Sequence, residues 1–342
     1  MDLKFLYIYK WCTFGGVERV LINRALAFRK FGFPVKADVF FFYGGIIQEL
    51  KNFLNKFNLS EYLKVVEKPD FKKYDFIVSI DTIEAFEIQE LKSLILEYHT
   101  PYEDHASYLF KVPAEKVKAV IVPSQYFKEV LRQKRPDLYS KSFVVRNFVI
   151  DDGFEEKDFY LPNWSLVPLV WIGRTDSVKN PHFIVDSIRV FSEKYGDKVF
   201  FCVVGSSQEE EIFLKKVESL RGRVIYYPNI KFERVKSFLK AISKRKGIFV
   251  SASKGESFGM AVAEAIYFGL PVLISDIPPH KELVKNKKVF LFKLSDINDF
   301  CQKLNYILEN YDILKKEIMD LKENLEAKNF IKDWQNFLNT NR

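Results

Sequence analysis

The chain repeats one pattern: a short apolar run, a loop with polar and glycine residues, and then apolar positions at helical spacing. Runs of about four to eight apolar residues are typical of strands that are buried on both faces of a parallel sheet. In the first half, such runs predict strands at residues 3–9, 35–42, 63–66, 75–79, 94–97, 117–124 and 143–147. In the second half, they predict strands at residues 167–173, 199–205, 223–227, 247–250 and 271–276.

Helices are predicted between these strands. The stripe that follows the first strand comprises Val20, Leu21, Ala25, Leu26 and Phe28. Strands that alternate with helices favour a parallel, doubly wound α/β sheet. Because the pattern stops and restarts in mid-chain, we expect two doubly wound Rossmann-like domains that face each other across a cleft. Beyond residue 276 we expect only helices, and the last one carries an apolar face with Ile331, Trp334 and Phe337.

The interruption between the halves predicts a domain boundary. Residues 151–158 are acidic and contain Gly153, and Pro162 follows them. This composition is typical of a linker. We therefore expect an N-terminal domain at residues 1–162 and a C-terminal domain at residues 163–326.

Composition narrows the class of protein. The chain has 342 residues, 48% of them hydrophobic, which is enough apolar material for two cores and argues against disorder. No apolar run approaches about 18 residues, and charges interrupt the N-terminus, so we expect a cytoplasmic protein with at most peripheral contact with a membrane. The cysteines (Cys12, Cys202 and Cys301) and the histidines are scattered, so no disulfide framework or metal site is predicted.

The net charge of +8 falls mainly on the second half, because the first 160 residues carry 24 basic and 23 acidic side chains. Nucleic acid is one partner of basic proteins. Here, however, basic residues alternate with acidic ones, as between Lys179 and Lys198. We therefore expect an ordinary solvated surface, an anionic small ligand or a membrane surface, and no nucleic acid.

The candidate chemistry centres on the segment between the strand at residues 247–250 and Pro271. A loop with Glu256 leads into a helix that is expected to begin near Gly259, and Glu264 lies more than one turn inside that helix. A helix start offers free N–H groups and the positive end of the helix dipole, which together bind anions. Carboxylates on both sides of such a site suit a phosphate ligand that also carries hydroxyls, such as a nucleotide-sugar.

A second candidate loop follows the strand at residues 167–173. Arg174 and Lys179 flank it, and Asn180-Pro181 is expected to start the next helix. Two cations at a helix start suit a diphosphate, since Arg supplies fork geometry and Lys a point charge. Solvated surface cations are the alternative.

The first half offers weaker candidates. Gly15 and Gly16 join a strand to a helix, as phosphate-binding turns do, although an ordinary glycine turn fits equally well. Asp81 and His99 follow strands at the edge where ligands bind in doubly wound sheets. The alternatives are a helix cap for Asp81 and a hydrogen-bonded loop histidine for His99.

Three motifs together resemble a known family. Glu256 and Glu264 within ESFGMAVAEAIYFGLPVLISDIP resemble the E-x7-E signature of retaining GT-B glycosyltransferases, particularly glycosyltransferase family 4. GGVERV, from Gly15, resembles the glycine-rich first loop of that family, and GRTDSVKNP, from Gly173, resembles its phosphate-binding segment. The motifs occur in the order and spacing of the family.

The resemblance implies roles in the second domain. Arg174 and Lys179 would bind the donor diphosphate and stabilise the leaving group, Glu256 would contact the transferred sugar, and Glu264 would bind the ribose. The remaining donor-binding positions would be Gly173, Gly205, Phe258, Gly259 and Met260.

The resemblance also implies roles in the first domain. Gly15 and Gly16 would approach the donor phosphate, His99 would lie near the reacting sugar, and Asp81 would lie on the acceptor side. A C-terminal helix at residues 327–342 would cross back onto this domain.

The implied function is a retaining glycosyltransferase that needs no metal or other cofactor. It would move a hexosyl-type sugar from a UDP- or GDP-sugar to a hydroxyl of a carbohydrate or lipid-linked acceptor, in the synthesis of a surface glycan or a lipid-linked glycan. The alternatives are a sugar-nucleotide epimerase or phosphorylase with the same fold, and a non-catalytic nucleotide-sugar-binding subunit.

Overall fold

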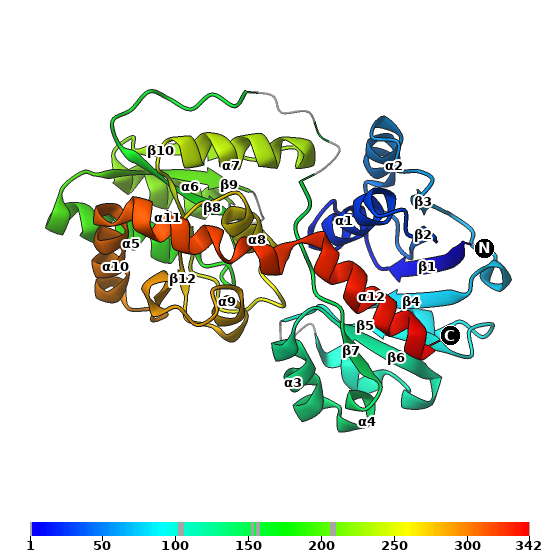
Figure 1. Cartoon of the computed structure of the whole chain (residues 1–342). Coiled ribbons are helices and arrows are strands. Elements are labelled where there is room, and N and C mark those ends of the chain that lie inside the picture. Colours follow the sequence, from blue (N-terminus) through cyan, green and yellow to red (C-terminus); the bar gives the residue numbers. More distant parts are fainter. Residues whose placement is uncertain (1, 102–105, 152–153, 155–157, 206–209, 342) are drawn as a thin grey trace. The chain divides into compact units, whose positions relative to one another are not determined.

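The structure is a computed structural model that describes residues 2–101, 106–151, 154, 158–205 and 210–341 (Figure 1). The chain divides into two compact units. The first unit comprises Met1–Phe154 together with Glu326–Arg342, and the second comprises Glu155–Leu325.

The first unit is built on a parallel sheet of seven strands among the described residues, in the order β3-β2-β1-β4-β5-β6-β7. Its strands are β1 (Leu3–Tyr9), β2 (Val35–Phe41), β3 (Leu63–Val65), β4 (Phe76–Ile80), β5 (Leu94–Glu97), β6 (Val117–Val122) and β7 (Ser142–Val144). The order reverses at β1, where β1 pairs with both β2 and β4. A reversal of this kind is the topological switch point at which doubly wound sheets bind ligands.

Helices connect and cover these strands. The α-helices of the first unit are α1 (Gly16–Lys30), α2 (Ile47–Lys56), α3 (Gln125–Lys134), α4 (Pro136–Tyr139) and α12 (Ala327–Asn341). Its short 3-10 helices are η1 (Phe71–Lys73), η2 (Ile83–Glu87), η3 (Ala106–Lys111) and η4 (Ala114–Lys116). Ser124 caps α3, because its hydroxyl accepts a hydrogen bond from the Phe127 N–H.

The C-terminal helix α12 packs on the first unit (red in Figure 1). Trp334 is fully buried, and its ring centroid lies 5.3 Å from that of Phe5 in β1 and 5.9 Å from that of Phe28 in α1. Asp333 also pairs with Arg146, with 2.7 Å between Oδ2 and Nε. The expected return of this helix to the first domain is confirmed.

The second unit contains a parallel sheet of six strands among the described residues, in the order β10-β9-β8-β11-β12-β13. Its strands are β8 (Val167–Ile172), β9 (Val199–Val204), β10 (Val224–Tyr227), β11 (Ile248–Ser251), β12 (Val272–Ser275) and β13 (Leu291–Phe292). The order again reverses at the first strand of the unit, since β8 pairs with β9 and β11. The expected fold class, with two doubly wound Rossmann-like domains, is therefore confirmed.

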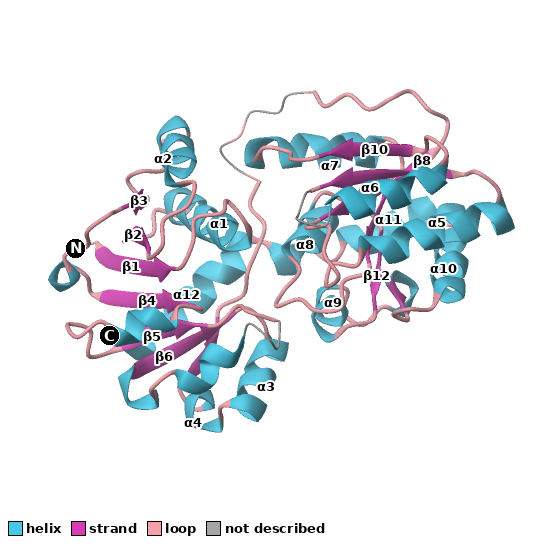
Figure 2. Ribbon diagram, turned by 180° about the vertical axis from the view of Figure 1, so that it is seen from behind, coloured by secondary structure: helices cyan, strands magenta, loops and turns pink. Residues whose placement is uncertain are grey.

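The helices of the second unit cover its sheet, and Figure 2 shows α5 and α10 side by side. The α-helices are α5 (Pro181–Tyr195), α6 (Glu210–Val217), α7 (Val235–Lys244), α8 (Met260–Tyr267), α9 (Pro278–Leu283), α10 (Ile297–Glu309) and α11 (Tyr311–Met319). The 3-10 helices are η5 (Glu218–Leu220), η6 (Phe232–Arg234), η7 (Lys288–Phe290) and η8 (Lys322–Leu325).

Some expectations of local structure differ from the fold. The expectation of helices alone beyond residue 276 is wrong, because β13 pairs with β12 there through only two residues, too few to form a recognisable apolar run. The first unit ends at Phe154, whereas the sequence predicts a boundary after residue 162. Much of the predicted linker, residues 152–153 and 155–157, lies outside the described residues.

Candidate functional site

In the second unit, the carboxyl ends of β8 and β9 meet at two glycines. The N–H of Gly173 donates to the carbonyl oxygen of Val204 at 3.0 Å. Gly205 has a φ of +138°, and a Cβ atom at this position would lie 1.7 Å from the carbonyl oxygen of Gly173. Only glycine fits such a contact, because it has no Cβ and tolerates a positive φ. Gly205 therefore lets the two strand ends lie against each other.

Asp176 organises the loop after β8. Its Oδ1 accepts a hydrogen bond from the Lys179 N–H at 2.8 Å, and its Oδ2 accepts one from Arg174 Nε at 2.8 Å. The loop then enters α5 through Asn180, in the left-handed conformation, and Pro181 at the first helical position. The helix start expected from Asn180-Pro181 is thus confirmed, and Asp176 connects the two predicted cations.

The loop after β11 is fixed by hydrogen bonds to its neighbours. The Lys254 N–H donates to the carbonyl oxygen of Val178 at 2.8 Å, which joins this loop to the loop after β8. The Ser275 hydroxyl, from the end of β12, donates to the carbonyl oxygen of Ser253 at 2.6 Å. The loop that carries Glu256 is therefore held on both sides.

Lys179 and Glu256 form an ion pair, with 2.5 Å between Nζ and Oε1. Their side chains are 22% and 13% exposed, so both ends of the pair are largely shielded from water. Burial alone would raise the pKa of Glu256, but the charge of Lys179 outweighs it and lowers this pKa below its ordinary value. The pair thus places a fixed positive and a fixed negative charge next to the start of α8.

The start of α8 presents free backbone donors. Gly259, its N-cap, has a φ of +91°. The N–H of Ala263 is the first to bond within the helix, to the carbonyl oxygen of Gly259 at 2.9 Å. The preceding N–H groups therefore lack an acceptor inside the helix and can bind an anion. Phe258 and Glu264 are buried on either side of this start.

His280 is a buried residue of this region that the sequence did not single out. It is fully buried, and its Nδ1 lies 2.9 Å from the carbonyl oxygen of Ser275, so Nδ1 carries the proton. Burial lowers the pKa of His280 to about 4, although the charge of Glu256 opposes this effect. Among the described residues, Nε2 has no hydrogen-bond partner. His280 is therefore a neutral support behind Gly259, whose Cβ would lie 3.8 Å from Nε2.

In the first unit, Glu18 braces the loop between β1 and α1. Its carboxylate accepts hydrogen bonds from the Thr13 N–H at 2.9 Å and the Gly15 N–H at 2.8 Å. Burial raises the pKa of Glu18, and these two hydrogen bonds act in the opposite direction. The Gly15 N–H is thus already engaged, whereas no atom would lie within 4 Å of a Cβ at Gly16.

His99 lies just after β5 and is held by Glu97, the last residue of that strand. The distance between His99 Nε2 and Glu97 Oε1 is 2.6 Å. Glu97 also receives two hydrogen bonds from Arg24 of α1, at 2.6 and 2.9 Å. The loop histidine is therefore hydrogen-bonded, as one of the two interpretations of His99 expects.

Asp81 holds the same loop from the end of β4. Its Oδ1 accepts hydrogen bonds from the His99 N–H at 2.9 Å and from the Tyr108 hydroxyl at 2.5 Å, and its Oδ2 accepts one from the Thr100 hydroxyl at 2.7 Å. Burial raises the pKa of Asp81, and the neighbouring His99 opposes this effect. The helix cap that was the alternative for Asp81 is not formed, because Thr82 is the N-cap of η2.

The predicted residues thus form two groups, one at the carboxyl edge of each sheet. The group in the second unit comprises Gly173, Arg174, Lys179, Gly205, Glu256, Phe258, Gly259, Met260 and Glu264. The group in the first unit comprises Gly15, Gly16, Asp81 and His99. The sequence analysis did not identify Glu97, Asp176 or His280 as site residues. Asp176 could have been identified, because it lies within the motif GRTDSVKNP, whereas Glu97 and His280 lie in none of the three motifs.

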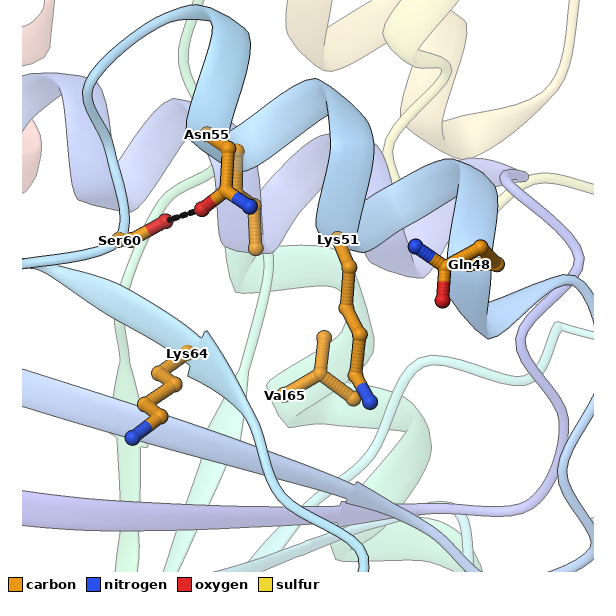
Figure 3. A pocket seen from close by; sticks show the side chains of 7 residues that line it. Gln48, Lys51, Asn55, Ser60, Lys64 and Val65 are labelled. Carbon is orange, nitrogen blue, oxygen red and sulfur yellow. Dashed lines mark hydrogen bonds between the residues drawn. The ribbon is translucent and has the colours of Figure 1, made fainter.

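A surface hollow of about 430 Å³ lies elsewhere in the first unit, between α2 and β3 (Figure 3). It is lined by Gln48, Lys51, Leu54, Asn55, Ser60, Lys64 and Val65, none of which is a predicted site residue. Its polar groups are partly paired, since Ser60 donates to Asn55 at 2.6 Å and Lys51 pairs with Glu67 at 2.7 Å. This hollow is therefore separate from both groups.

In the described part of the chain, no helix combines the length and apolar character that crossing a bilayer requires. Within the same residues, no three His, Cys, Asp or Glu side chains gather in a way that could hold a metal ion.

Residues 168–327 match the model of the family described as glycosyl transferases group 1. A probable sucrose-phosphate synthase from Thermosipho melanesiensis is 23% identical over 340 residues, which cover 90% of this chain and 78% of that protein.

Solved structures share the fold over nearly the whole chain. HepE from Anabaena, crystallised with UDP and glucose, superposes with a TM-score of 0.76 at 16% identity and covers 99% of this chain and 100% of its own. TarM from S. aureus, crystallised with UDP and sugar ligands, has a TM-score of 0.76 at 14% identity, with the same coverage. The family match and the shared fold together support a glycosyltransferase with the GT-B fold.

Proposed function

We propose that the protein is a retaining, metal-independent glycosyltransferase that moves a hexosyl-type sugar from a nucleoside diphospho-sugar to a hydroxyl acceptor. The ion pair of Lys179 and Glu256, directly ahead of the free N–H groups of α8, carries this proposal. It combines groups that suit the two parts of the donor: a cation and a helix start for the diphosphate, and a carboxylate for sugar hydroxyls.

The proposed chemistry depends on charge that develops during the reaction. As the sugar–phosphate bond breaks, positive charge grows on the sugar and negative charge grows on the departing diphosphate. Lys179, Arg174 and the start of α8 stabilise the departing diphosphate, and this interaction strengthens in the transition state. These fixed charges take the role that a divalent ion plays in other enzymes, so no metal is needed in this proposal.

The other donor contacts follow from position. Glu264, buried inside the first turns of α8, accepts hydrogen bonds from the ribose hydroxyls. Gly173 and Gly205 leave room for the nucleotide at the strand ends, where a side chain on Gly205 would collide with the backbone. Glu256 contacts the transferred sugar once the diphosphate competes for Lys179.

A uridine nucleotide is the donor that the relatives favour. HepE and TarM were both crystallised with UDP, and HepE also with glucose. The relative from Thermosipho melanesiensis is a probable sucrose-phosphate synthase, a name that supports hexosyl transfer. We therefore propose a UDP-sugar as co-substrate, with UDP-glucose as the first probe.

On the first unit, we propose that His99 contacts the reacting sugar and that Gly16 provides space for the donor phosphate. Asp81 acts on the acceptor side by fixing the loop of His99, since its two oxygens already accept three hydrogen bonds. Its part is thus to hold the loop in place.

An aromatic pair on the first unit supports a carbohydrate in the acceptor. Trp11 and Tyr43 follow β1 and β2, their ring centroids lie 5.0 Å apart, and the residues are 50% and 46% exposed. The Tyr43 hydroxyl donates to Glu84 at 2.8 Å, which fixes the ring. The apolar face of a sugar ring packs on such rigid aromatic surfaces, while the neighbouring carboxylate accepts hydrogen bonds from its hydroxyls. We therefore propose a carbohydrate acceptor that belongs to a surface glycan or a lipid-linked glycan.

A thermal-shift screen with UDP-, GDP- and ADP-sugars tests the donor, followed by product analysis with the sugar that binds. We expect a UDP-sugar to raise the melting temperature, and the nucleoside diphosphate to be released in the presence of EDTA. An epimerised nucleotide-sugar would indicate the epimerase alternative, release of a sugar phosphate would indicate a phosphorylase, and binding without turnover would indicate a non-catalytic subunit. Activity that disappears with EDTA and returns with a divalent ion would contradict the metal-free proposal.

A further inference from the structure

Glu97 connects a buried cation to the candidate histidine of the first unit. Its Oε1 lies 2.6 Å from both Arg24 Nη2 and His99 Nε2, and its Oε2 lies 2.9 Å from Arg24 Nη1. The side chains of Arg24 and Glu97 are 2% and 0% exposed, whereas that of His99 is 10% exposed. A two-pronged contact of this kind fixes the carboxylate in one orientation.

Both members of the buried pair are charged. Burial alone would raise the pKa of Glu97, but Arg24 and then His99 outweigh it and lower this pKa to about 2. The guanidinium of Arg24 also lies 5.3 Å from the ring centroid of Trp334 and 5.8 Å from that of Phe330, both in α12. The C-terminal helix therefore covers the pair with aromatic faces, which stabilise a cation.

The charge of Glu97 determines where the proton of His99 lies. An ionised carboxylate only accepts hydrogen bonds, so the ring nitrogen at 2.6 Å, Nε2, must carry a proton and donate. In the neutral ring, Nδ1 then has the lone pair. Among the described residues, no hydrogen bond to Nδ1 is present, and the ring keeps some exposure.

The backbone of His99 is fixed as well. Asp81 accepts a hydrogen bond from the His99 N–H at 2.9 Å and another from the hydroxyl of Thr100, the next residue. His99 is thus held from two strands, its ring by Glu97 at the end of β5 and its backbone by Asp81 after β4. A residue fixed at both its ring and its backbone loses little freedom when a ligand binds.

We propose that Arg24 and Glu97 are a positioning pair, which fixes the ring of His99 with its proton on Nε2 and presents Nδ1 as a hydrogen-bond acceptor to a hydroxyl of the bound sugar. The identity of that ligand rests on the proposed function, but the state of the ring does not. The C-terminal helix contributes to the pair through the aromatic rings that cover Arg24.

Nitrogen-15 NMR of the full chain with ring-labelled histidine tests the state of the ring. The signals of His99 are assigned by their loss in His99→Gln, and His182→Gln serves as the control. We expect a protonated Nε2 and an unprotonated Nδ1, and a shift of the Nδ1 signal when UDP-glucose is added. A proton on Nδ1, averaging of both nitrogens, or an unchanged Nδ1 signal at saturating UDP-glucose would overturn the proposal.

A paired variant tests the positioning role. Glu97→Gln alone would leave Arg24 buried without a counter-charge, which threatens folding. Arg24→Met together with Glu97→Leu removes both charges at similar volume, a change that folded proteins often tolerate. We expect kcat to fall by about 10- to 100-fold, because the ring is no longer aligned, and the His99 nitrogens to lose their fixed proton.

The matched control is Arg146→Met with Asp333→Leu, which removes another ion pair of the first unit, between the segment after β7 and α12. We expect this control to keep kcat close to that of the wild type. Wild-type kcat in the Arg24/Glu97 variant, or an unchanged proton position, would overturn the positioning role. If the wild type transfers no sugar, the proposed function fails, while the NMR result still decides the state of His99.

Discussion

Lys179 Nζ lies 2.5 Å from Glu256 Oε1, and the two residues are 77 positions apart in the sequence. The loops that carry them are joined by the hydrogen bond from the Lys254 N–H to the carbonyl oxygen of Val178. In the proposed mechanism, the bound donor separates this pair and its two parts satisfy both charges: the diphosphate contacts Lys179 and the sugar hydroxyls contact Glu256. Binding therefore exchanges one set of charge contacts for another.

Lys179→Ala should lower kcat by about 100-fold or more, because the lost charge contact strengthens as the diphosphate departs. The measurement is steady-state release of UDP from UDP-glucose. Lys254→Ala is the matched control, since its side chain is exposed on the neighbouring loop and has no assigned role. Equal rates in the wild type and Lys179→Ala would show that Lys179 does not bind the diphosphate.

Glu264→Ala should weaken donor binding more than it slows turnover. Its carboxylate is assigned to the ribose, which does not change during the reaction, so its contribution is similar in the ground state and the transition state. Isothermal titration with UDP should show a dissociation constant raised by about 10-fold, the value of one charged hydrogen bond. Glu309→Ala, on the exposed side of α10, should leave it unchanged. An unchanged constant in Glu264→Ala argues against the ribose role.

Gly205→Ala should destabilise the second unit by about 2–4 kcal/mol, because the new Cβ would lie 1.7 Å from the carbonyl oxygen of Gly173. Gly196→Ala is the control. Gly196 also has a positive φ, +80°, but no atom would lie within 4 Å of its Cβ, so only the backbone strain of about 1 kcal/mol remains. Urea unfolding measures both variants. An equal decrease in the free energy of unfolding in the two variants would show that the contact between the strand ends does not contribute to stability.

Trp11→Ala should raise the KM for a carbohydrate acceptor by about 10-fold and leave the KM for the donor nearly unchanged, since an aromatic surface for the acceptor is lost. Phe110→Ala is the control, because Phe110 is a similarly exposed aromatic residue of the same unit. The acceptor for this assay is whichever glycan accepts sugar from the wild type. A larger effect on the KM for the donor would indicate that Trp11 contacts the donor and not the acceptor.

His280 should make the stability of the protein depend on pH. Its pKa in the folded protein is about 4, below the ordinary value of 6.5, so the unfolded chain binds the proton more readily between these values. The free energy of unfolding should therefore fall by roughly 2 kcal/mol from about pH 7 to about pH 5 through this residue alone. His280→Gln should reduce the slope of stability against pH, as urea unfolding at several pH values can measure. An identical slope in the variant contradicts a buried neutral His280.

Much of the fold could be predicted because each buried strand leaves a local signature. The apolar runs located β1, β8 and β11 to within a residue or two, and Asn180-Pro181 located the start of α5. The two-residue β13 leaves no such signature, because its pairing with β12 depends on residues distant in the sequence.

The site was predictable only where a motif lies within one loop. Lys179 and Glu256 could be nominated because each lies after a strand and before a helix. Glu97 looked like any strand residue, because its importance comes from Arg24 on α1 and from the aromatic rings of α12 at the end of the chain. Contacts between such distant segments are determined by packing and are not visible in a local pattern.

We propose that the protein transfers sugar from a nucleoside diphospho-sugar with retention and without a metal. Proton NMR of UDP-glucose incubated with the full chain and excess EDTA tests it directly, with water as the acceptor. We expect release of UDP together with glucose that first appears as the α anomer, and a much lower rate of both in Lys179→Ala. Glucose that first appears as the β anomer would exclude retention, and turnover that begins only when a divalent ion is added would exclude the metal-free mechanism.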